Sequence, residues 1–147
     1  MKIKMVNKSG FPLPEYQSKE AAGIDLRAAI SKSITFKPHK VYQIPTGIFL
    51  EIPPGFEGQI RARSGLALRH GITLVNGIGT IDSDYRGEIC VIMMNLLNQD
   101  YTIEPGDRIA QLVFSKIYQA EIIEVSMVSS LKKTDREDGG FGHSGRK

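Results

Sequence analysis

Residues 72–92 read ITLV-NGIGTIDSDYRG-EICVI, which is two short apolar runs on either side of a polar, glycine-rich segment. The apolar runs are rich in the β-branched residues Ile, Val and Thr, which favour strands. Asn, Asp, Ser and Gly in the middle segment favour turns. We therefore expect a β-hairpin, in which two strands are joined by residues 76–87.

Short β-rich runs separated by Pro and Gly recur along the rest of the chain. They are residues 33–36, 42–44, 59–63 and 109–114, with turn signals at 53–55 and 104–107. Only residues 64–69 read as a short helix, which the Ser64 side chain could cap. Many short strands at this spacing predict an all-β, jelly-roll-like sandwich or barrel subunit. A chain of 147 residues predicts one domain over residues 1–147.

Composition narrows the class of protein. The net charge of +3 suits an anionic ligand but lacks the basic stripe of a nucleic-acid-binding protein, so we expect no nucleic-acid partner. No apolar run reaches the ~18 residues of a membrane span, and the N-terminus lacks the apolar stretch of a signal peptide. We expect no membrane association and a cytoplasmic location. The one cysteine, Cys90, lies in an apolar run and reads as a small buried side chain.

The polar segment from about residue 130 to 147 lacks apolar periodicity, and residues 135–147 contain four glycines, two arginines and Phe141. Glycine is costly to order and adds nothing to a core, so this segment is expected to be mobile in the free protein. Bare backbone N–H groups, Arg and Ser can bind a phosphate, and Phe can stack on a planar ring. The segment reads either as a flexible C-terminal lid over a nucleotide-like ligand or as a simple linker.

Two polar positions in the first half of the chain are candidates for ligand binding. Asp25 lies in an apolar, small-residue strand (residues 21–29), either as an edge acid facing solvent or as a ligand of a hard cation such as Mg²⁺. A salt bridge to Arg27 does not by itself explain it. Arg61-Ala62-Arg63-Ser64-Gly65 places a guanidinium, a hydroxyl and a glycine before a helical turn. This suits phosphate binding, although a solvated basic strand end would look the same.

Two further positions carry both a structural and a functional interpretation. An Asp in the segment 76–87 is either a turn former or, within a pocket, a group that could deprotonate water. Gln111 interrupts the apolar strand 109–114, where it is either hydrogen-bonded structurally or a ligand contact. The spacing of histidines, cysteines and acids does not match a transition-metal site.

Five segments taken together resemble the trimeric dUTPase family from about residue 5 to 145. They are Ala-Gly-Ile-Asp-Leu-Arg at 22–27, Arg-Ser-Gly-Leu-Ala at 63–67, Ile-Asp-Ser-Asp-Tyr-Arg-Gly at 81–87, Gly-Asp-Arg-Ile-Ala-Gln-Leu at 106–112 and Gly-Gly-Phe-Gly at 139–142. The resemblance implies a homotrimer whose active sites each use three chains, with the C-terminal tail lent to a neighbour. It implies hydrolysis of dUTP to dUMP and pyrophosphate with Mg²⁺, which keeps uracil out of DNA and supplies dUMP for thymidylate synthesis.

The resemblance also implies roles for individual residues. Asp82 corresponds to the general base, and Tyr85 to the ring beneath the deoxyribose, where it leaves no room for a 2′-hydroxyl. Asp25 corresponds to the acid that holds Mg²⁺ through water. The uracil pocket corresponds to Asn76, Gly79, Thr80 and Ile81. The remaining substrate contacts are Arg63, Ser64, Gly65 and Gln111 for phosphates, Arg136 for the γ-phosphate, Phe141 stacked on uracil, and Gly142 and Ser144 for further phosphate hydrogen bonds.

The tail departs from the family pattern Arg-Gly-x-Gly-Gly-Phe-Gly-Ser-Thr-Gly. Glu137 and Asp138 follow Arg136 and are expected to face solvent, and His143 leaves one usual hydroxyl contact in doubt. Two other functions compete. A dCTP deaminase shares the fold, but its catalytic Glu corresponds to Ile92 here, and an apolar side chain cannot shuttle protons. A catalytically idle nucleotide-binding module would be expected to lack Asp82, Tyr85 or the tail.

Overall fold

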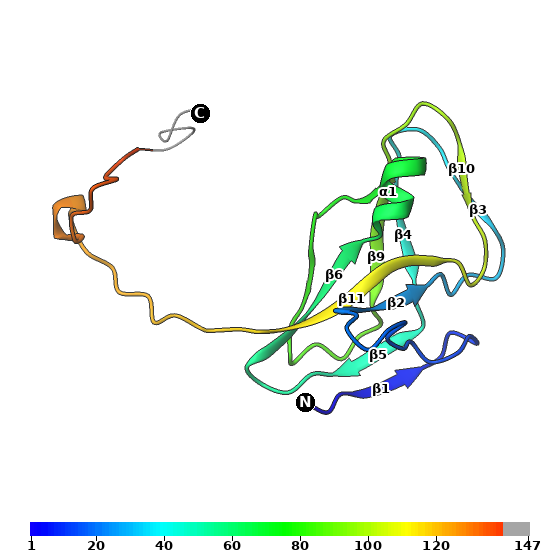
Figure 1. Ribbon diagram of the computed structural model, residues 1–147, viewed down its shortest axis with the longest axis horizontal. Coiled ribbons are helices and arrows are strands. Elements are labelled where there is room, and N and C mark those ends of the chain that lie inside the picture. Colours follow the sequence, from blue (N-terminus) through cyan, green and yellow to red (C-terminus); the bar gives the residue numbers. More distant parts are fainter. Residues whose placement is uncertain (140–147) are drawn as a thin grey trace.

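The computed structural model of the protein describes residues 1–139 and is mostly β (Figure 1). Phe141, Gly142 and Ser144, and with them His143, lie outside the described residues. One short α-helix, α1 (Ser64–His70), and a 3₁₀ turn, η1 (Val128–Ser130), accompany the strands. The strands are β1 (Lys4–Asn7), β2 (Gly23–Arg27), β3 (Ile34–Phe36), β4 (Val41–Pro45), β5 (Ile48–Glu51), β6 (Phe56–Ala62), β7 (Ile72–Leu74), β8 (Gly79–Ile81), β9 (Cys90–Asn95), β10 (Tyr101–Ile103) and β11 (Arg108–Lys116).

The strands form four antiparallel sheets. The largest has the order β2-β11-β6-β8, and the second has the order β4-β9-β7. Two strand pairs, β1-β5 and β10-β3, complete the body. Across residues 1–139 none of these sheets closes on itself, so the expected β class is confirmed but a closed barrel is not formed. Of the helices in that range, none is long and apolar enough to cross a membrane.

The segment from 72 to 92 is more open than the expected hairpin. Its flanking strands do pair, with Leu74 opposite Met93. Between them, however, β8 turns away and pairs with β6, with Gly79 opposite Ile60. A Cβ at Gly79 would lie 3.2 Å from the Cβ of Ile60, so the absence of a side chain permits this close approach. The loop therefore bridges the two larger sheets and leaves a space between β8 and β9.

The expected helix is confirmed, but the expected cap is wrong. Arg63 is the N-cap residue and makes no side-chain capping bond, while Ser64 is already the first helical residue. The helix ends at Gly71, whose left-handed φ of 63° suits glycine. A Cβ at Gly71 would lie 2.5 Å from Leu97 Cγ, so glycine is required there on packing grounds as well.

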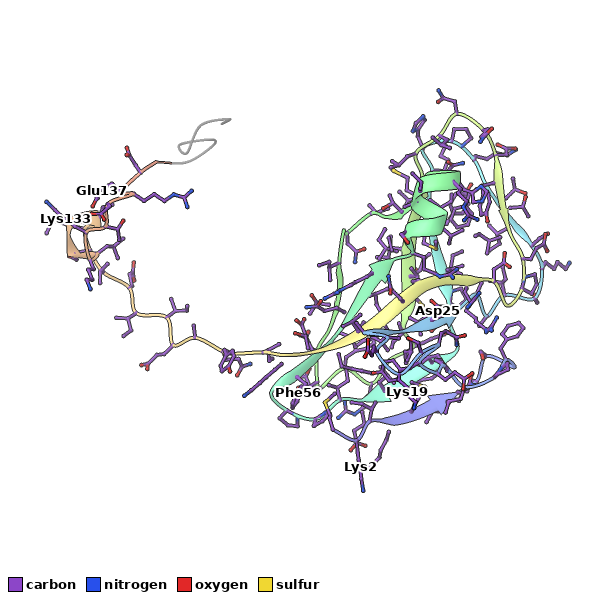
Figure 2. The ribbon with its side chains drawn as sticks, in the orientation of Figure 1. Lys2, Lys19, Asp25, Phe56, Lys133 and Glu137 are labelled. Atoms are coloured by element: carbon purple, nitrogen blue, oxygen red, sulfur yellow. The ribbon has the colours of Figure 1, made fainter. Side chains whose placement is uncertain are left out.

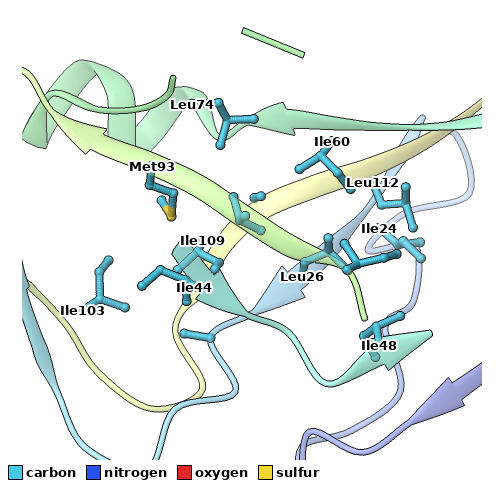
Figure 3. Close-up of a cluster of buried hydrophobic side chains, with 14 of the residues drawn as sticks. Ile24, Leu26, Ile44, Ile48, Ile60, Leu74, Met93, Ile103, Ile109 and Leu112 are labelled. Atoms are coloured by element: carbon cyan, nitrogen blue, oxygen red, sulfur yellow. The ribbon is translucent and has the colours of Figure 1, made fainter. Parts of the chain in front are cut away.

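Both larger sheets contribute to one hydrophobic core (Figure 3). Leu26 and Leu112 come from the four-stranded sheet, and Ile44 and Met93 from the three-stranded sheet, and all four are almost completely buried. Cys90, at the start of β9, is only half-buried, which differs from the expectation of a buried side chain. Every buried side-chain nitrogen or oxygen in the described part of the chain has a hydrogen-bond partner.

The chain leaves the body after β11 and extends away as an arm, residues 118–139 (Figure 1). The N–H of Ile117 still donates to the Gly55 carbonyl, at 3.0 Å. Beyond this bond the large apolar side chains are exposed: Ile122 is 86% exposed and Val128 84%. The arm thus includes residues 118–129 before the polar segment expected from about residue 130, and these added residues carry exposed apolar side chains.

Candidate active site

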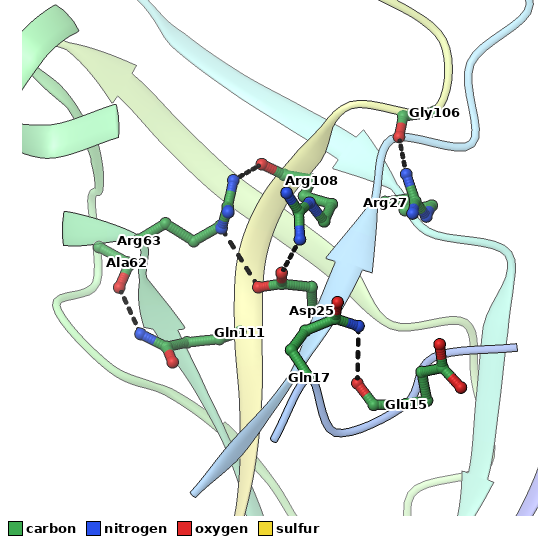
Figure 4. Close-up of polar contacts among 9 residues, drawn as sticks. All are labelled: Glu15, Gln17, Asp25, Arg27, Ala62, Arg63, Gly106, Arg108 and Gln111. Atoms are coloured by element: carbon green, nitrogen blue, oxygen red, sulfur yellow. Dashed lines mark hydrogen bonds and ion pairs between the residues drawn. The ribbon is translucent and has the colours of Figure 1, made fainter. Parts of the chain in front are cut away.

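Asp25 lies at the centre of an ion-pair cluster. It is in the middle of the edge strand β2, and its side chain is only 18% exposed. Its Oδ1 lies 3.2 Å from Arg63 Nε, and its Oδ2 lies 3.1 Å from Arg108 Nη1 (Figure 4). Arg27 points elsewhere and donates to the Gly106 carbonyl at 2.8 Å. Asp25 is therefore paired with two cations and does not face solvent as a free edge acid.

Arg63 is held by a second contact, because its Nη1 donates to the Arg108 carbonyl at 2.7 Å. The guanidinium is thus fixed at the end of β6, immediately before the exposed Ser64 and Gly65 of the first helical turn. Arg108 was not among the site residues predicted from the sequence. Its place in the same motif as Gln111 was the available signal.

Gln111 lies opposite Asp25 on the neighbouring strand, where β11 pairs with β2. Its Nε2 donates to the Ala62 carbonyl at 3.1 Å, which ties β11 to the end of β6. This bond matches the structural interpretation of Gln111. It also places Gln111 beside Arg63. We call the four residues Asp25, Arg63, Arg108 and Gln111 the arginine cluster (Figure 4).

A separate cavity of about 240 Å³ lies where β8, the following loop and β9 diverge. Four of its lining residues were predicted from sequence, namely Thr80, Ile81, Asp82 and Tyr85. Five were not, namely Gln43, Glu88, Ile89, Cys90 and Ile92. Asn76 lies beside this wall, since a Cβ on Gly79 would be 3.2 Å from Asn76 Nδ2. We call this cavity the hairpin pocket.

The loop that carries Asp82 is closed by its own hydrogen bonds. The Tyr85 N–H donates to the Asp82 carbonyl at 3.1 Å. Arg86 Nη1 donates to the carbonyls of Ser83 and Tyr85, at 2.7 and 2.9 Å. Both Asp82 and Tyr85 are exposed, so they can contact a ligand or another chain from this position.

The thiol of Cys90 is part of the pocket wall. Burial raises its pKa above 9.0, a nearby Glu88 carboxylate raises it further, and a hydrogen bond with Gln43 opposes the change. A raised pKa favours the neutral thiol, which is a poor nucleophile.

The arginine cluster and the hairpin pocket are separated within one chain. Ile81 pairs with Gly58 on β6, and Arg63 follows Gly58 by five residues. At about 3.3 Å per residue, these positions lie roughly 16 Å apart along β6. Asp82 follows Ile81 on an antiparallel strand and so is still farther from Arg63. One chain therefore does not place both groups around a single reacting atom.

The end of the arm forms a small turn around Arg136. The Thr134 N–H donates to Glu137 Oε1 at 2.8 Å, and the Glu137 N–H donates to Thr134 Oγ1 at 3.2 Å. Glu137 has a left-handed φ of 43°, at the position where the dUTPase pattern has glycine. Figure 2 shows Glu137 and Lys133 on the arm, well away from Asp25. Arg136 is thus remote from the arginine cluster of its own chain.

The arginine cluster fits a magnesium ion only indirectly. Within residues 1–139 no three His, Cys, Asp or Glu side chains gather as metal ligands. Asp25 Oδ2 accepts a hydrogen bond from Arg108, and Oδ1 is ion-paired with Arg63, yet a carboxylate oxygen has a second lone pair. Mg²⁺ usually keeps several waters and takes one or two carboxylates plus substrate phosphates. Asp25 therefore suits an ion held through water.

Comparisons with known proteins agree with one another. Residues 9–145 match the family model described as dUTPase. The deoxyuridine 5'-triphosphate nucleotidohydrolase of Finegoldia magna is 54% identical over 145 residues, which is 99% of each chain. The dUTPase of Staphylococcus bacteriophage 80alpha, solved with dUPNHPP, has a TM-score of 0.86 at 25% identity over 98% of each chain. A mutant dUTPase of phage phi11 of S. aureus, in which a structural Mg(II) ion is coordinated, has a TM-score of 0.76 at 22% identity, over 88% of this chain and 99% of that one.

Proposed function

The chain belongs to the dUTPase family, and we propose that it hydrolyses dUTP to dUMP and pyrophosphate with uracil and deoxyribose in the hairpin pocket. The observation that carries this proposal is that Asp82 and Tyr85 line the same cavity as Thr80 and Ile81. These residue types supply a base for water, a ring for the sugar and backbone groups for the uracil edge. A structural neighbour with a dUTP analogue bound supports the same substrate.

Each step has a group in the chain to perform it. Asp82 accepts a proton from the water whose oxygen attacks the α-phosphorus. The bond from that phosphorus to the bridging oxygen then breaks, and pyrophosphate leaves with the bonding electrons. Arg63, Ser64 and Gly65 bind the oxygens on which negative charge accumulates. Gln111 lies beside them on β11.

We assign the magnesium site to the arginine cluster. When bound to the triphosphate, Mg²⁺ neutralises charge on the phosphate oxygens. We propose that Asp25 accepts a hydrogen bond from a water of that ion, while its pairing with Arg63 and Arg108 holds both cations beside the phosphates.

We propose a homotrimer in which each active site draws on several chains. Arg63 and Asp82 are both assigned to the reaction at one phosphorus, yet they are too far apart within a chain. A cyclic arrangement lets one copy supply the arginine cluster and its neighbour the hairpin pocket. The exposed apolar arm supports the same arrangement, because Ile122, Val128 and Leu131 need a surface to cover them.

The arm would then deliver the C-terminal segment, about residues 130–147, to a neighbour's site. We propose that Arg136 binds the γ-phosphate there. Phe141 would stack on the uracil, and Gly142 and Ser144 would add phosphate contacts, although these three lie beyond residue 139. A cytoplasmic location stays a prediction from sequence.

The deaminase alternative is disfavoured by the pocket itself. Ile92, at the position corresponding to the deaminase Glu, lines the cavity with an apolar side chain. Glu88 also lines it, but its Oε1 accepts a hydrogen bond from the Gly47 N–H at 2.7 Å. An idle binding module is the second alternative, and it is disfavoured because Asp82 and Tyr85 are both present in the pocket.

The deciding experiment supplies dUTP, dCTP, UTP and dTTP separately with Mg²⁺ and measures pyrophosphate and ammonia independently. The proposed function predicts pyrophosphate from dUTP, far less from the other three, and no ammonia from dCTP. Ammonia from dCTP would identify a deaminase. Binding of dUTP without either product would identify an idle module.

A further inference from the structure

Glu88 links two parts of the fold through both its side chain and its backbone. Its Oε1 accepts the Gly47 N–H at 2.7 Å, and its carbonyl accepts the Tyr85 hydroxyl at 3.0 Å. The side chain thus attaches residue 88 to the turn between β4 and β5. The carbonyl in turn holds the far end of the Tyr85 ring.

The turn to which Glu88 is attached is itself rigid. Gly47 is buried and has a φ of 67°, and a Cβ there would lie 2.4 Å from the Ser9 nitrogen. Its N–H direction is therefore fixed by backbone packing that no other residue would tolerate. Thr46 Oγ1 donates to the Ile89 carbonyl at 2.6 Å, which adds a second bond between the turn and the residue after Glu88.

The ring of Tyr85 is held on another side by Gly87. A Cβ on Gly87 would lie 2.3 Å from the Tyr85 hydroxyl oxygen, so the ring packs directly against this backbone. Tyr85 is nevertheless 45% exposed, and its ring forms part of the hairpin pocket. An exposed aromatic ring normally keeps some rotamer freedom, and the hydrogen bond to the Glu88 carbonyl removes it.

We propose that Glu88 is a positioning residue that fixes the Tyr85 ring and thereby sets discrimination between deoxyribose and ribose. This inference rests on the proposed function, which assigns the ring to the sugar. Rejection of a 2′-hydroxyl requires a ring that keeps its position when the sugar binds. The hydrogen bonds that link Gly47, Glu88 and Tyr85 hold the ring in that position. Loss of the side-chain bond loosens residue 88, its carbonyl and then the ring, while Ile89 stays bonded to the turn and to β5.

The test compares kcat/KM for dUTP and UTP in three variants. Glu88→Ala removes the acceptor for Gly47 and should lower the dUTP-to-UTP ratio about tenfold, which corresponds to about 1.4 kcal/mol of lost hydrogen bonding. Glu88→Gln keeps an amide oxygen that can accept the same bond and should keep most of the ratio. Glu104→Ala changes an exposed Glu on the turn before β11 and should leave the ratio unchanged.

A merely structural role would lower kcat/KM for both substrates equally, and an unchanged ratio in Glu88→Ala would overturn the proposal. If that variant does not fold, Tyr85→Phe removes the donor and keeps the ring, and it should lower the ratio by a similar factor. A crystal structure provides a test that does not depend on activity. Suppose that in Glu88→Ala the Tyr85 ring keeps its original rotamer and is still bonded to the carbonyl of residue 88. That result would refute the proposal, even if the wild-type protein failed to cleave dUTP.

Discussion

Asp25 Oδ1 lies 3.2 Å from Arg63 Nε, and this pair joins the edge strand β2 to the N-terminus of α1. The arginine is held at the residue immediately before Ser64 and Gly65, which begin the helix. A carboxylate that is mostly shielded from water can hold a guanidinium more firmly than a fully exposed one. Asp25 therefore has two functions in the proposed site, as an outer ligand of magnesium and as the partner that orients Arg63.

Asp25→Asn should lower kcat/KM for dUTP roughly tenfold to a hundredfold even at saturating Mg²⁺, because two charge-assisted contacts are weakened. The measurement is steady-state kinetics over a range of Mg²⁺ concentrations. Asp100→Asn is the matched control, since Asp100 forms an ion pair with Lys37 on the exposed surface and should have no effect. Full recovery of Asp25→Asn by excess Mg²⁺ would show that Asp25 serves the metal alone.

Asp82→Asn should keep binding of a dUTP analogue and lower kcat by at least ~10², a typical contribution of a general base. The asparagine has nearly the same shape but cannot accept the proton from water. Asp84→Asn is the control, because Asp84 lies on the same exposed loop and is outside the lining of the hairpin pocket. Similar turnover in the Asp82 and Asp84 variants would argue against the assignment.

Deletion of residues 135–147 should abolish turnover and change the Tm by less than about 2 °C. Surface changes remote from a core typically alter the free energy of unfolding by no more than about 0.5 kcal/mol. The described hydrogen bonds of Arg136 and Glu137 are all within the arm, so their removal leaves the core intact. Differential scanning calorimetry and a pyrophosphate assay measure the two effects. A large fall in Tm would show that the segment is part of the folded body.

Alkylation of Cys90 by iodoacetamide should accelerate as the pH rises, with an apparent pKa above 9.0. The cause is burial, which keeps the folded thiol neutral at a pH where the unfolded thiol ionises. The pKa of the thiol is higher in the folded protein than in the unfolded protein. Its contribution to the free energy of unfolding is therefore fully present below the unfolded pKa and is lost as the pH rises through the folded pKa. Cys90→Ala is the control, because the chain has no other cysteine. A midpoint below that of an ordinary exposed cysteine thiol would mean that the thiol is activated.

Local patterns in the sequence were sufficient for several of the elements, but not for all of them. The runs at 34–36, 59–62 and 109–114 are strands, and the short helix after Arg63 is present, because β-branched alternation and Gly/Pro turns act locally. β8 was not predicted, since Gly79–Ile81 reads as part of a loop. It becomes a strand because Gly79 allows β6 to approach closely. This contact depends on tertiary packing, which local sequence patterns do not reveal.

The site was less accessible to sequence analysis than the fold. Motifs named Asp25, Arg63 and Asp82, but spacing along the chain does not reveal which partners meet in space. Arg108 and Glu88 act through contacts across strands, and Arg108 and Asp25 are 83 positions apart in the sequence. The arm was also not predicted before residue 130, and the structure leaves its apolar side chains Ile122 and Val128 exposed.

Complementation between two inactive variants tests the shared active site most directly. One chain carries Asp82→Asn with an intact tail, and the other keeps Asp82 but lacks residues 135–147. Each is first shown to be inactive alone, and subunit exchange after mixing is verified by native mass spectrometry. If each site takes Asp82 and the tail from different copies, a mixed trimer has one complete site. An equal mixture should then recover about one quarter of wild-type activity. No activity despite proven exchange would contradict the shared site.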